Sequence, residues 1–429
     1  MKTTFVATGD SFITRRIPEH YPGRDVLQEL LMKHDVRFNN LEITCHEDAG
    51  YPAAFSGGTW AMADPAVLDD LKALGFNLFN TANNHASDFS HGGLLETIRN
   101  LKKRGLVYAG TGKNMAEASK AVYLDTAECR VALIGITSDF HDSDLAGEQG
   151  PVVAGRPGVN GMRVNRVCHV TEDYLGVLRS LVNETNMNSY EEYGVKLGYV
   201  NPATADTLSM AGMRFCLDER NYIEEKPAKA DLERTVLEIQ EAGRQADYVM
   251  VSIHTHGGSY EDYANPPEFL EVFARACIDA GADVILGHGP HELRAVEVYN
   301  GKPIFYSLGN FIFQTETVDR QPAEAYSNKG LPVTMKVGEY MDRRSDGGKR
   351  GYGILPPVWF SVIPSWTMEN GTVTQIRLYP VTLGRELPRS RRGFPRLTED
   401  DGILEHLQKL SSIYRTRIEI QDHVGIIRL

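Results

Sequence analysis

Carboxylate, amide and imidazole side chains recur along the chain, each just after a short apolar run. They are Asp10, Glu42, Asn84, His85, His254, His256, His288 and His291. Carboxylate and imidazole groups are ligands and proton carriers, and together they suit Mn, Fe or Zn better than Ca. None of the five cysteines forms a CxxC pair, so a structural thiolate zinc site is not indicated. The pattern predicts a divalent-metal site that holds one or two ions per chain.

Each of these residues taken alone also has a purely structural explanation. Asp10 follows Gly9 and could belong to a turn, while Asn84 could form an Asx-turn. His254 could be a core histidine bonded to the backbone. The segment GHGPH, which holds His288 and His291, fits a structural role less well, because its glycines let the backbone bend so that both imidazoles face inward. The joint pattern therefore favours function.

The elements that position these side chains are short predicted strands. The apolar runs are Thr4–Thr8, Val36–Leu41, Phe76–Thr81, Tyr248–Ile253 and Val284–Leu286. Loops at the carboxyl ends of strands are where α/β folds bind ligands. We therefore expect the polar residues that follow these runs to converge on one point.

Helical patterns alternate with the strands and indicate an α/β fold. They are Arg24–His34, a helix that opens at Asp64-Pro65 and ends at Gly75, Gly92–Arg104, Lys229–Gln245 and Pro267–Ala280. Two strands are expected around Ala127-Glu128 within Ala121–Thr137, and two more near Ala295–Tyr299 and Ile304–Ser307. The second half lacks some of the helices, which predicts mixed sheets packed as two layers.

The alternation lapses in an insertion at about 138–228, which carries one clear helix near Asp173–Val182. Insertions of this length are usually functional or disordered. Arg156, Arg163 and Arg166 could clamp a carboxylate or phosphate in two-pronged contacts, with Asn160 beside them, so this region is a candidate for substrate recognition. The alternative is a solvated loop. Residues 315–429 form a β-containing extension that closes with a helix near Asp400–Ser411.

Composition limits the partners and the compartment. The chain has 45 basic and 57 acidic side chains, for a net charge of −12, which argues against nucleic acid or an anionic membrane as partner. No apolar stretch approaches the ~18 residues needed to span a bilayer. The apolar stretch that Asp10 ends is too short for a signal peptide. We therefore expect a cytoplasmic protein with reduced cysteines.

Several segments resemble the CapA family of capsule (poly-gamma-glutamate) synthesis proteins, which belongs to the calcineurin-like metallophosphatase superfamily. They are GDSFITRR (Gly9–Arg16), NNLE (Asn39–Glu42), TANNHASDFSHGG (Thr81–Gly93), YAGTG (Tyr108–Gly112), VSIHTH (Val251–His256) and Gly287–Phe313. The resemblance covers roughly Thr3–Thr137 and Asp247–Gln314, and it implies one domain over 1–314. It also implies a four-layer αββα sandwich of mixed sheets with the metal at the strand ends.

The resemblance also implies residue roles. Asp10 and Glu42 match the metal-binding carboxylates, Asn84 the amide ligand, His254 the histidine ligand, His288 and His291 the closing pair, and His85 the general acid. The superfamily usually opens with Asp-x-His, whereas Asp10-Ser11-Phe12 supplies no histidine. One metal position is thus short of a ligand unless His256 or His291 compensates.

These residues predict a metal-dependent enzyme with hydrolase-type chemistry on an anionic phosphoester or a peptide- or polyglutamate-like substrate. His85 would be the general acid, with His291 or His256 as a second proton-transfer group. A first alternative keeps the metal and predicts a peptide epimerase that removes and returns an α-proton on a ribosomal peptide such as a lasso-peptide precursor. A second alternative is a non-catalytic polymer or peptide binder.

Overall fold

Two β-sheets carry most of the fold in the computed structural model, which describes residues 2–429. The ten-stranded sheet contains β1 (Lys2–Phe12), β2 (Val36–Leu41), β5 (Leu78–Asn80), β6 (Val107–Ala109), β19 (Asn310–Phe313), β20 (Phe360–Glu369), β21 (Thr372–Thr382), β22 (Arg396–Leu397), β23 (Glu419–Gln421) and β24 (Val424–Arg428). The six-stranded sheet contains β8 (Val122–Asp125), β9 (Arg130–Thr137), β15 (Tyr248–His254), β16 (Val284–His288), β17 (Leu293–Tyr299) and β18 (Lys302–Leu308). Both sheets mix parallel and antiparallel pairs.

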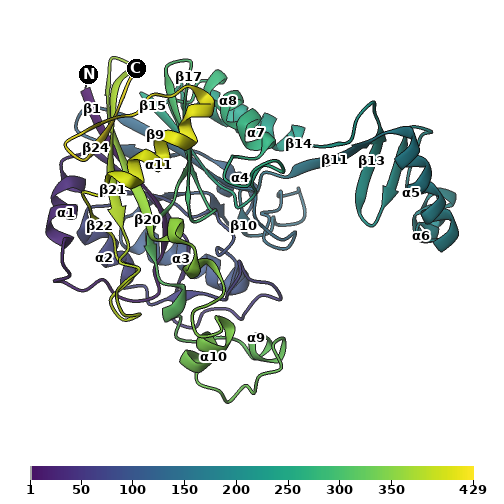
Figure 1. Ribbon diagram of the computed structural model, residues 1–429, viewed down its shortest axis with the longest axis horizontal. Helices are drawn as coiled ribbons and strands as arrows, with labels where there is room; N and C mark the ends of the chain where they lie inside the picture. Colours follow the sequence, from purple (N-terminus) through teal and green to yellow (C-terminus); the bar gives the residue numbers. More distant parts are fainter. Residues whose placement is uncertain (1) are drawn as a thin grey trace.

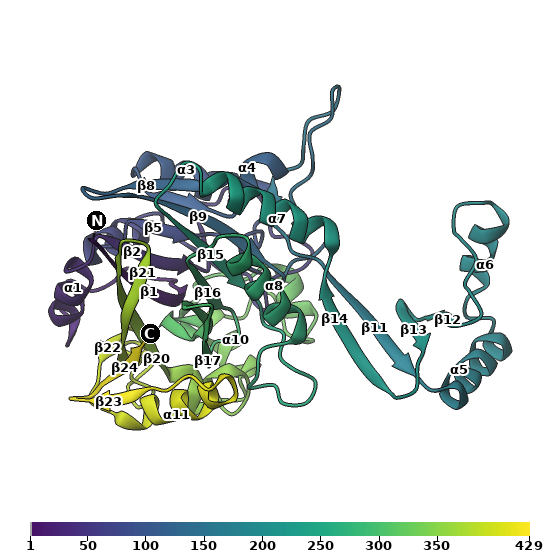
Figure 2. The same cartoon turned by 90° about the horizontal axis from the view of Figure 1, so that it is seen from above.

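Helices flank these sheets and their ends. They are α1 (Arg24–Met32), α2 (Val67–Leu74), α3 (Ser90–Lys103), α4 (Met115–Ser119), α7 (Lys229–Ala242), α8 (Glu268–Asp279), α9 (Ala323–Ser327), α10 (Val337–Arg344) and α11 (Asp401–Ser411). The minor elements are β3 (Thr44–Cys45), β4 (Met62–Ala63), β7 (Thr111–Gly112), β10 (Gly158–Val159), η1 (Thr315–Thr317), η2 (Tyr352–Ile354), η3 (Pro356–Trp359) and η4 (Ser412–Tyr414). Figures 1 and 2 show their arrangement, with α7 and α8 over the six-stranded sheet.

The alternation of side chains along β1 shows how the layers are built. Phe5 and Ala7 point into the apolar core between the two sheets, where they join Leu133 and Leu286 of the six-stranded sheet. Val6 points to the opposite face, because successive strand residues face opposite ways. The strands are thus buried on both faces, and the predicted α/β class is confirmed.

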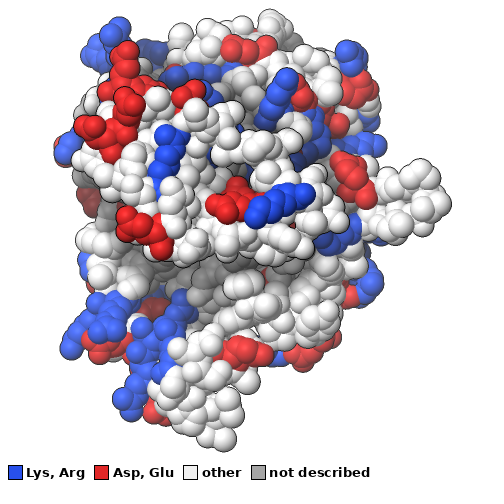
Figure 3. Space-filling model, turned by 90° about the vertical axis from the view of Figure 1, so that its right-hand side faces the viewer, with Lys and Arg blue, Asp and Glu red and all other residues white. Residues whose placement is uncertain are grey.

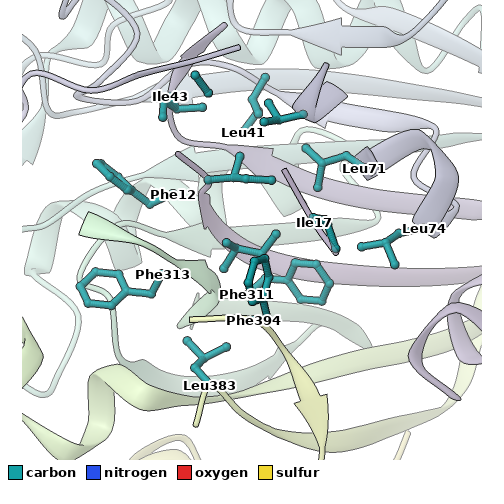
Figure 4. Close-up of a cluster of buried hydrophobic side chains, with 14 of the residues drawn as sticks. Phe12, Ile17, Leu41, Ile43, Leu71, Leu74, Phe311, Phe313, Leu383 and Phe394 are labelled. Carbon is teal, nitrogen blue, oxygen red and sulfur yellow. The ribbon is translucent and has the colours of Figure 1, made fainter. Parts of the chain in front are cut away.

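The outer face of the ten-stranded sheet packs on α1 and α2 through a second apolar cluster. Figure 4 shows this cluster, in which Leu71 and Leu74 of α2 lie beside Leu41, Phe311 and the buried Phe394. On the other side of the molecule, Phe269 and Phe273 of α8 pack on Val251 of β15. Each sheet is therefore fixed by apolar contacts on both sides.

The local signals in the sequence placed most elements well. β2 has the predicted bounds, and α2 ends at Gly75, whose φ of +119° is the left-handed cap that glycine favours. The Asp64 side chain accepts a hydrogen bond of 2.8 Å from the backbone N–H of Ala66, just before that helix begins. β1 extends to Phe12, four residues beyond the predicted Thr4–Thr8, because Gly9, Asp10 and Ser11 remain in the strand.

Because neighbouring strands run parallel, the polar residues at their carboxyl ends lie at the same edge of each sheet. β1 runs parallel to β2, and β15 runs parallel to β9 and β16, with His254 opposite His288. Gly9 permits close contact at this edge, since a Cβ atom there would stand 1.9 Å from the carbonyl oxygen of Gly309. The carboxyl ends of β1, β2, β15 and β16 consequently carry the candidate ligands.

The C-terminal extension completes the larger sheet. β20 pairs antiparallel with β1, and β21 pairs with β20 and β24. α11, which was predicted near Asp400–Ser411, packs through Leu404 and Leu407 into the core between the sheets. Residues after 315 therefore share a hydrophobic core with the N-terminal strands.

The middle of the insertion forms an arm that projects from the body of the molecule (Figures 1 and 2). Its four-stranded sheet has the order β12 (Thr207–Met210), β13 (Met213–Leu217), β11 (Val164–Val170) and β14 (Tyr222–Pro227). It also carries α5 (Glu172–Thr185), where one helix was predicted, and α6 (Ser189–Lys196), which was not predicted. A small cluster around Leu175, Val182 and Phe215 forms the core of the arm.

Two expectations from composition can be compared with the structure. Cys45, Cys129, Cys168, Cys216 and Cys277 are all free thiols. Among residues 2–429, no helix has the length and apolarity required to cross a membrane.

Phe5 offers a test of the contact between the sheets. Its ring stacks on Trp366 of β20 with centroids 5.3 Å apart, and meets Tyr248 of β15 edge-on at 5.6 Å. We expect Phe5→Ala to lower the free energy of unfolding by about 3–5 kcal/mol in urea denaturation, because a buried aromatic ring is lost and a cavity remains. Leu237→Ala on α7, where the side chain is exposed, is the control and should change stability by less than about 0.5 kcal/mol. Equal effects would contradict the assigned core.

Candidate metal centre

The predicted ligands meet at the carboxyl ends of β1, β2, β15 and β16. Asp10, Glu42, His254 and His288 are completely buried, and His291 is nearly so. Three overlapping groups have ligand atoms close enough to share an ion, and they are Asp10 with His254 and His288, Glu42 with His254 and His256, and Asp10 with Glu42 and His291. The structure thus brings together the predicted carboxylates and imidazoles from distant parts of the chain.

The separations between these atoms are close to those of ligands that share one ion. His254 Nδ1 lies 3.0 Å from His288 Nδ1, and each of these atoms lies 3.7 Å from Asp10 Oδ1. On the other side of the His254 ring, Nε2 lies 3.3 Å from His256 Nε2 and 3.6 Å from Glu42 Oε1. Atoms bound at 2.0–2.2 Å to one ion stand about 3–3.5 Å apart. His254 is therefore shared by two neighbouring ligand groups.

The carboxylate of Glu42 is the group of the site that most needs a neutralising partner. Its side chain is completely buried, and neither carboxylate oxygen accepts a hydrogen bond from the residues that the structure describes. A buried charge without a partner is strongly unfavourable unless a proton or a cation neutralises it. Imidazole nitrogens of His254 and His291 lie 3.6 and 3.8 Å from Glu42 Oε1. This carboxylate fits a cation.

Burial shifts the protonation of the whole cluster. It raises the pKa of Asp10 to about 7, although hydrogen bonds from the Gly289 N–H and Asn40 lower it, and it raises the pKa of Glu42 well above its usual range. Burial also lowers the pKa of His256, His288 and His291 to about 3. The imidazoles are thus neutral, the form that binds metals, whereas the carboxyl groups hold protons unless a cation displaces them.

A chain of amides holds Asp10 in place. Asn80 Nδ2 donates to Asn40 Oδ1 at 2.8 Å, and Asn40 Nδ2 donates to Asp10 Oδ1 at 2.7 Å. The Gly289 N–H donates to the other Asp10 oxygen at 3.0 Å. Sequence analysis did not identify Asn40 and Asn80, although both lie at the ends of predicted strands, where polar residues interrupt apolar runs.

The GHGPH segment orients its two imidazoles by different means. His288 bonds to Ser252 Oγ through Nε2 at 2.6 Å, so Nδ1 faces Asp10. His291 has a φ of +62°, an uncommon conformation for a residue with a side chain, and its Nδ1 lies 2.9 Å from Asn310 Oδ1. Strained backbone of this kind clusters at functional sites. Ser252 and Asn310 are positioning residues that sequence analysis missed.

The segment Asn83-Asn84-His85 divides its tasks among its members. Asn83, rather than Asn84, forms the Asx-turn, since its Oδ1 accepts a 3.1 Å hydrogen bond from the N–H of His85. Asn84 donates to the Gly57 carbonyl at 2.8 Å, and its own Oδ1 is buried with no partner among residues 2–429. An amide oxygen left free in this way is suited to bind a metal ion.

His85 forms a buried pair with Asp88. Its Nδ1 lies 2.7 Å from Asp88 Oδ2, and Asp88 also accepts hydrogen bonds from the N–H groups of Gly57 and Ala61. Because Asp88 fixes Nδ1, Nε2 is the ring nitrogen that remains for proton transfer. Sequence analysis missed Asp88, although the local spacing of three residues could have indicated it.

Phe12 lies two residues after Asp10, at the position where the family resemblance leads us to expect a histidine. Its ring meets the His85 ring edge-on, with centroids 4.9 Å apart. The residue therefore supports the imidazole of His85 through packing and offers no ligand. His256, whose backbone N–H donates to Asp139 at 2.7 Å, supplies an additional imidazole to the Glu42 group.

The predicted substrate residues all have partners within the chain. Arg156 donates to the carbonyl groups of Leu145 and Asp142, and Asn160 donates to the carbonyl of Gly135. Arg163 forms a two-pronged ion pair with Asp231, and Arg166 pairs with Glu225. Their role in substrate binding stays a prediction. Among them, Arg166 is near enough to the half-buried Asp139 to lower the pKa of its carboxyl group, which desolvation raises to about 6.

The residues present fit a divalent cation. Carboxylate and imidazole donors lie close together, and among residues 2–429 neither the Glu42 carboxylate nor the amide oxygen of Asn84 has a hydrogen-bond partner. This donor set favours Mn, Fe or Zn.

Comparison with known proteins reveals relatives along the whole chain. Residues 4–315 match the family described as bacterial capsule synthesis protein PGA_cap. An uncharacterized protein of Sinorhizobium fredii is 34% identical over 99% of this chain and 93% of its own length. The capsule biosynthesis protein CapA of Bacillus anthracis is 29% identical over 58% of this chain and 43% of its own length, and the PGA biosynthesis protein CapA of Bacillus subtilis is 28% identical over 57% and 44%.

The raised pKa of Asp10 predicts that metal binding releases protons. A carboxyl group with a pKa of about 7 is mostly protonated at pH 6 and mostly ionised at pH 8.5. Titration with Mn²⁺ at pH 6, by calorimetry in buffers of different ionisation enthalpy, should therefore show release of about one proton or more per chain. The release should shrink at pH 8.5, and Asp10→Asn should reduce it at pH 6. A proton release that is near zero at pH 6 would contradict the assignment.

Proposed function

Since the chain belongs to the family of bacterial capsule synthesis proteins, we propose that it is a divalent-metal-dependent enzyme with hydrolase-type chemistry. The observation that carries this proposal is the fully buried Glu42, which has no hydrogen-bond partner among residues 2–429 and lies amid neutral imidazoles. The helices outside two facing sheets agree with the four-layer calcineurin-like arrangement that the family resemblance implies. The printed names of the Bacillus relatives refer to capsule and PGA biosynthesis, which supports an anionic peptide- or polyglutamate-like substrate, with a phosphoester as the other candidate.

The proposed ligands are Asp10, Glu42, Asn84, His254 and His288, with His256 or His291 completing the set. When bound, a divalent ion supplies Lewis-acid polarisation of a phosphoryl or carbonyl oxygen and lowers the pKa of water. Asn40 and Ser252 orient the ligands Asp10 and His288 through the hydrogen bonds described above.

His85 is the proposed general acid. Asp88 holds Nδ1, so a proton on Nε2 can pass to the leaving group without rotation of the ring. Phe12 packs on the imidazole and limits its movement. His291 is placed in a similar way, with Nδ1 held by Asn310 and Nε2 directed toward Glu42 at 3.8 Å.

The similar placement of His85 and His291 favours peptide epimerisation as the second candidate function. Each imidazole has one nitrogen fixed by an oxygen acceptor, which leaves Nε2 for proton transfer. An epimerase needs two such groups, one to remove the α-proton and one to return it. Incorporation of solvent deuterium into a peptide without cleavage would favour this reaction, whereas new amine or phosphate would favour hydrolysis.

Metal content per chain tests the shared premise of both reactions. Elemental analysis of protein purified without chelator should find one or two divalent ions per chain. The double variant Asp10→Ala, His254→Ala should lose them, because it removes two ligands of the same group. Full retention of metal in the folded double variant would exclude this centre. Wild-type protein that takes up no ion, even when Mn or Zn is supplied, would leave the non-catalytic binder.

His85→Gln and Asp88→Asn test the proton-transfer role. Each should lower kcat by about 10²–10⁴-fold at unchanged metal content, since general acid catalysis contributes on that scale. The assay would measure turnover of p-nitrophenyl phosphate and of glutamyl peptides by the Mn-loaded enzyme. His423→Gln is the matched control, because His423 forms a similar pair with Asp401 on the surface, at 3.1 Å. Loss of activity that tracks loss of metal would instead assign His85 a structural role.

A further inference from the structure

A cavity of about 640 Å³ opens beside the metal centre, and residues of the C-terminal extension form most of its wall. The wall combines the end of α10, the glycine-rich stretch 347–353 and the loop that holds Arg389 and Arg392. Only Phe313, Thr315 and Glu316 of the wall lie at or before residue 316.

Two aromatic side chains join this cavity to the proposed centre. Phe313 and Tyr352 line the cavity, and both contact the imidazole of His291, with ring centroids 5.5 and 5.0 Å apart. Burial raises the pKa of Tyr352 to about 12. The cavity is therefore adjacent to His291, one of the residues of the proposed centre.

The backbone at Gly57 and Gly58 makes a second connection. Arg344 Nη2 donates to the carbonyl of Gly58 at 2.9 Å. The preceding residue, Gly57, accepts a hydrogen bond from Asn84 and donates its N–H to Asp88. Arg344 thus lies one peptide unit away from the groups that position Asn84 and His85.

The charges of the cavity wall are unbalanced. Its ionisable residues include four arginines and two acids, which leaves an excess of two positive charges in a chain whose net charge is −12. Arg389 pairs with Asp342, and Arg392 pairs with Glu316, so both acids are used. Figure 3 shows Lys and Arg side chains gathered on the lower part of one face, the level at which α9 and α10 lie in Figure 1.

Arg344 and Arg350 are the cations that remain. Arg344 is partly buried and has no carboxylate within 4.0 Å among residues 2–429, and burial lowers its pKa. Arg350 is exposed, and the one carboxylate within 4.0 Å of it among residues 2–429 is that of Asp346. An arginine guanidinium stays protonated even where burial lowers its pKa. Its planar N–H donors match the geometry of carboxylate and phosphate oxygens.

We propose that this cavity binds an oxyanion of the substrate, carboxylate or phosphate, through Arg344 and Arg350, while the reacting group lies at the metal centre. The assignment rests on the proposed function for the reaction, but the binding itself does not require turnover. The family match ends at residue 315, before both arginines, whereas the S. fredii relative aligns over 99% of the chain. The cavity is thus a specificity element that the extension adds to the family site.

Calorimetric titration of the full chain with an unlabelled hexaglutamate peptide, and separately with inorganic phosphate, tests this inference. We expect Arg344→Gln, Arg350→Gln together to weaken binding of the preferred anion by about 10- to 100-fold, since two charge-assisted contacts are lost. Arg350→Gln alone, at an exposed position that should not affect folding, is expected to weaken it by several-fold. If the variants lose affinity for the peptide alone, the ligand of the cavity is a carboxylate. If they lose affinity for phosphate alone, the ligand is a phosphate.

Arg343→Gln is the matched control, because Arg343 lies on the same helix, pairs with Glu339 and does not line the cavity. It carries the same change of charge and should leave binding within about twofold. Equal affinities of wild type and the cavity variants, equal weakening by Arg343→Gln, or no binding of either anion by wild type would overturn the inference. Elemental analysis of the same samples separates the two proposals. Loss of affinity at unchanged metal content concerns the cavity alone. Arginine-dependent binding by a chain that takes up no metal would refute the proposed reaction but not anion binding in the cavity.

Discussion

The burial of Glu42 next to Asp10 is the constraint on which the site depends. Taking a carboxylate out of water costs several kcal/mol or more unless a counter-charge or hydrogen bonds replace the solvent. Asp10 has such hydrogen bonds from Asn40 and Gly289, whereas Glu42 has none from the residues described. The surrounding imidazoles are neutral and cannot offset the charge. A fold that keeps this arrangement needs strand ends rigid enough to resist local collapse, and the cores on both faces of each sheet supply that rigidity.

Hydrophobic periodicity was sufficient to locate most of the scaffold. The strand Val36–Leu41 and the helix near Asp400–Ser411 were predicted closely, because each is bounded by clear local signals. β1 was predicted too short because an apolar run ends at its first polar residue, while Asp10 and Ser11 are polar residues that stay buried within the strand. The same rule identifies these residues as candidate ligands: a polar residue at the end of a buried strand violates the hydrophobic pattern, and such violations are expected at functional positions.

Local sequence patterns could not identify interaction partners that are distant along the chain. Asn310, which orients His291, lies 19 residues from it in the sequence. β20 pairs with β1 although most of the chain lies between them. No local sequence pattern encodes either contact. The arginines of the insertion show the opposite case. Their clustering was visible in the sequence, but their partners Asp231 and Glu225 lie 68 and 59 residues away, so the pairing of Arg163 and Arg166 within the chain could not be seen.

The proposed metal centre and the cavity lie in parts of the chain that are packed differently. The ligands lie on strands whose positions the two cores fix, so their geometry cannot change without loss of packing. The cavity wall after residue 315 consists of short helices and turns with exposed glycines at positive φ. The Bacillus relatives align with little more than half of this chain, and the family match stops where the wall begins. Under the proposed function, the metal ligands and the substrate-binding cavity therefore belong to parts of the chain under different packing constraints, an arrangement that would let one centre serve different substrates.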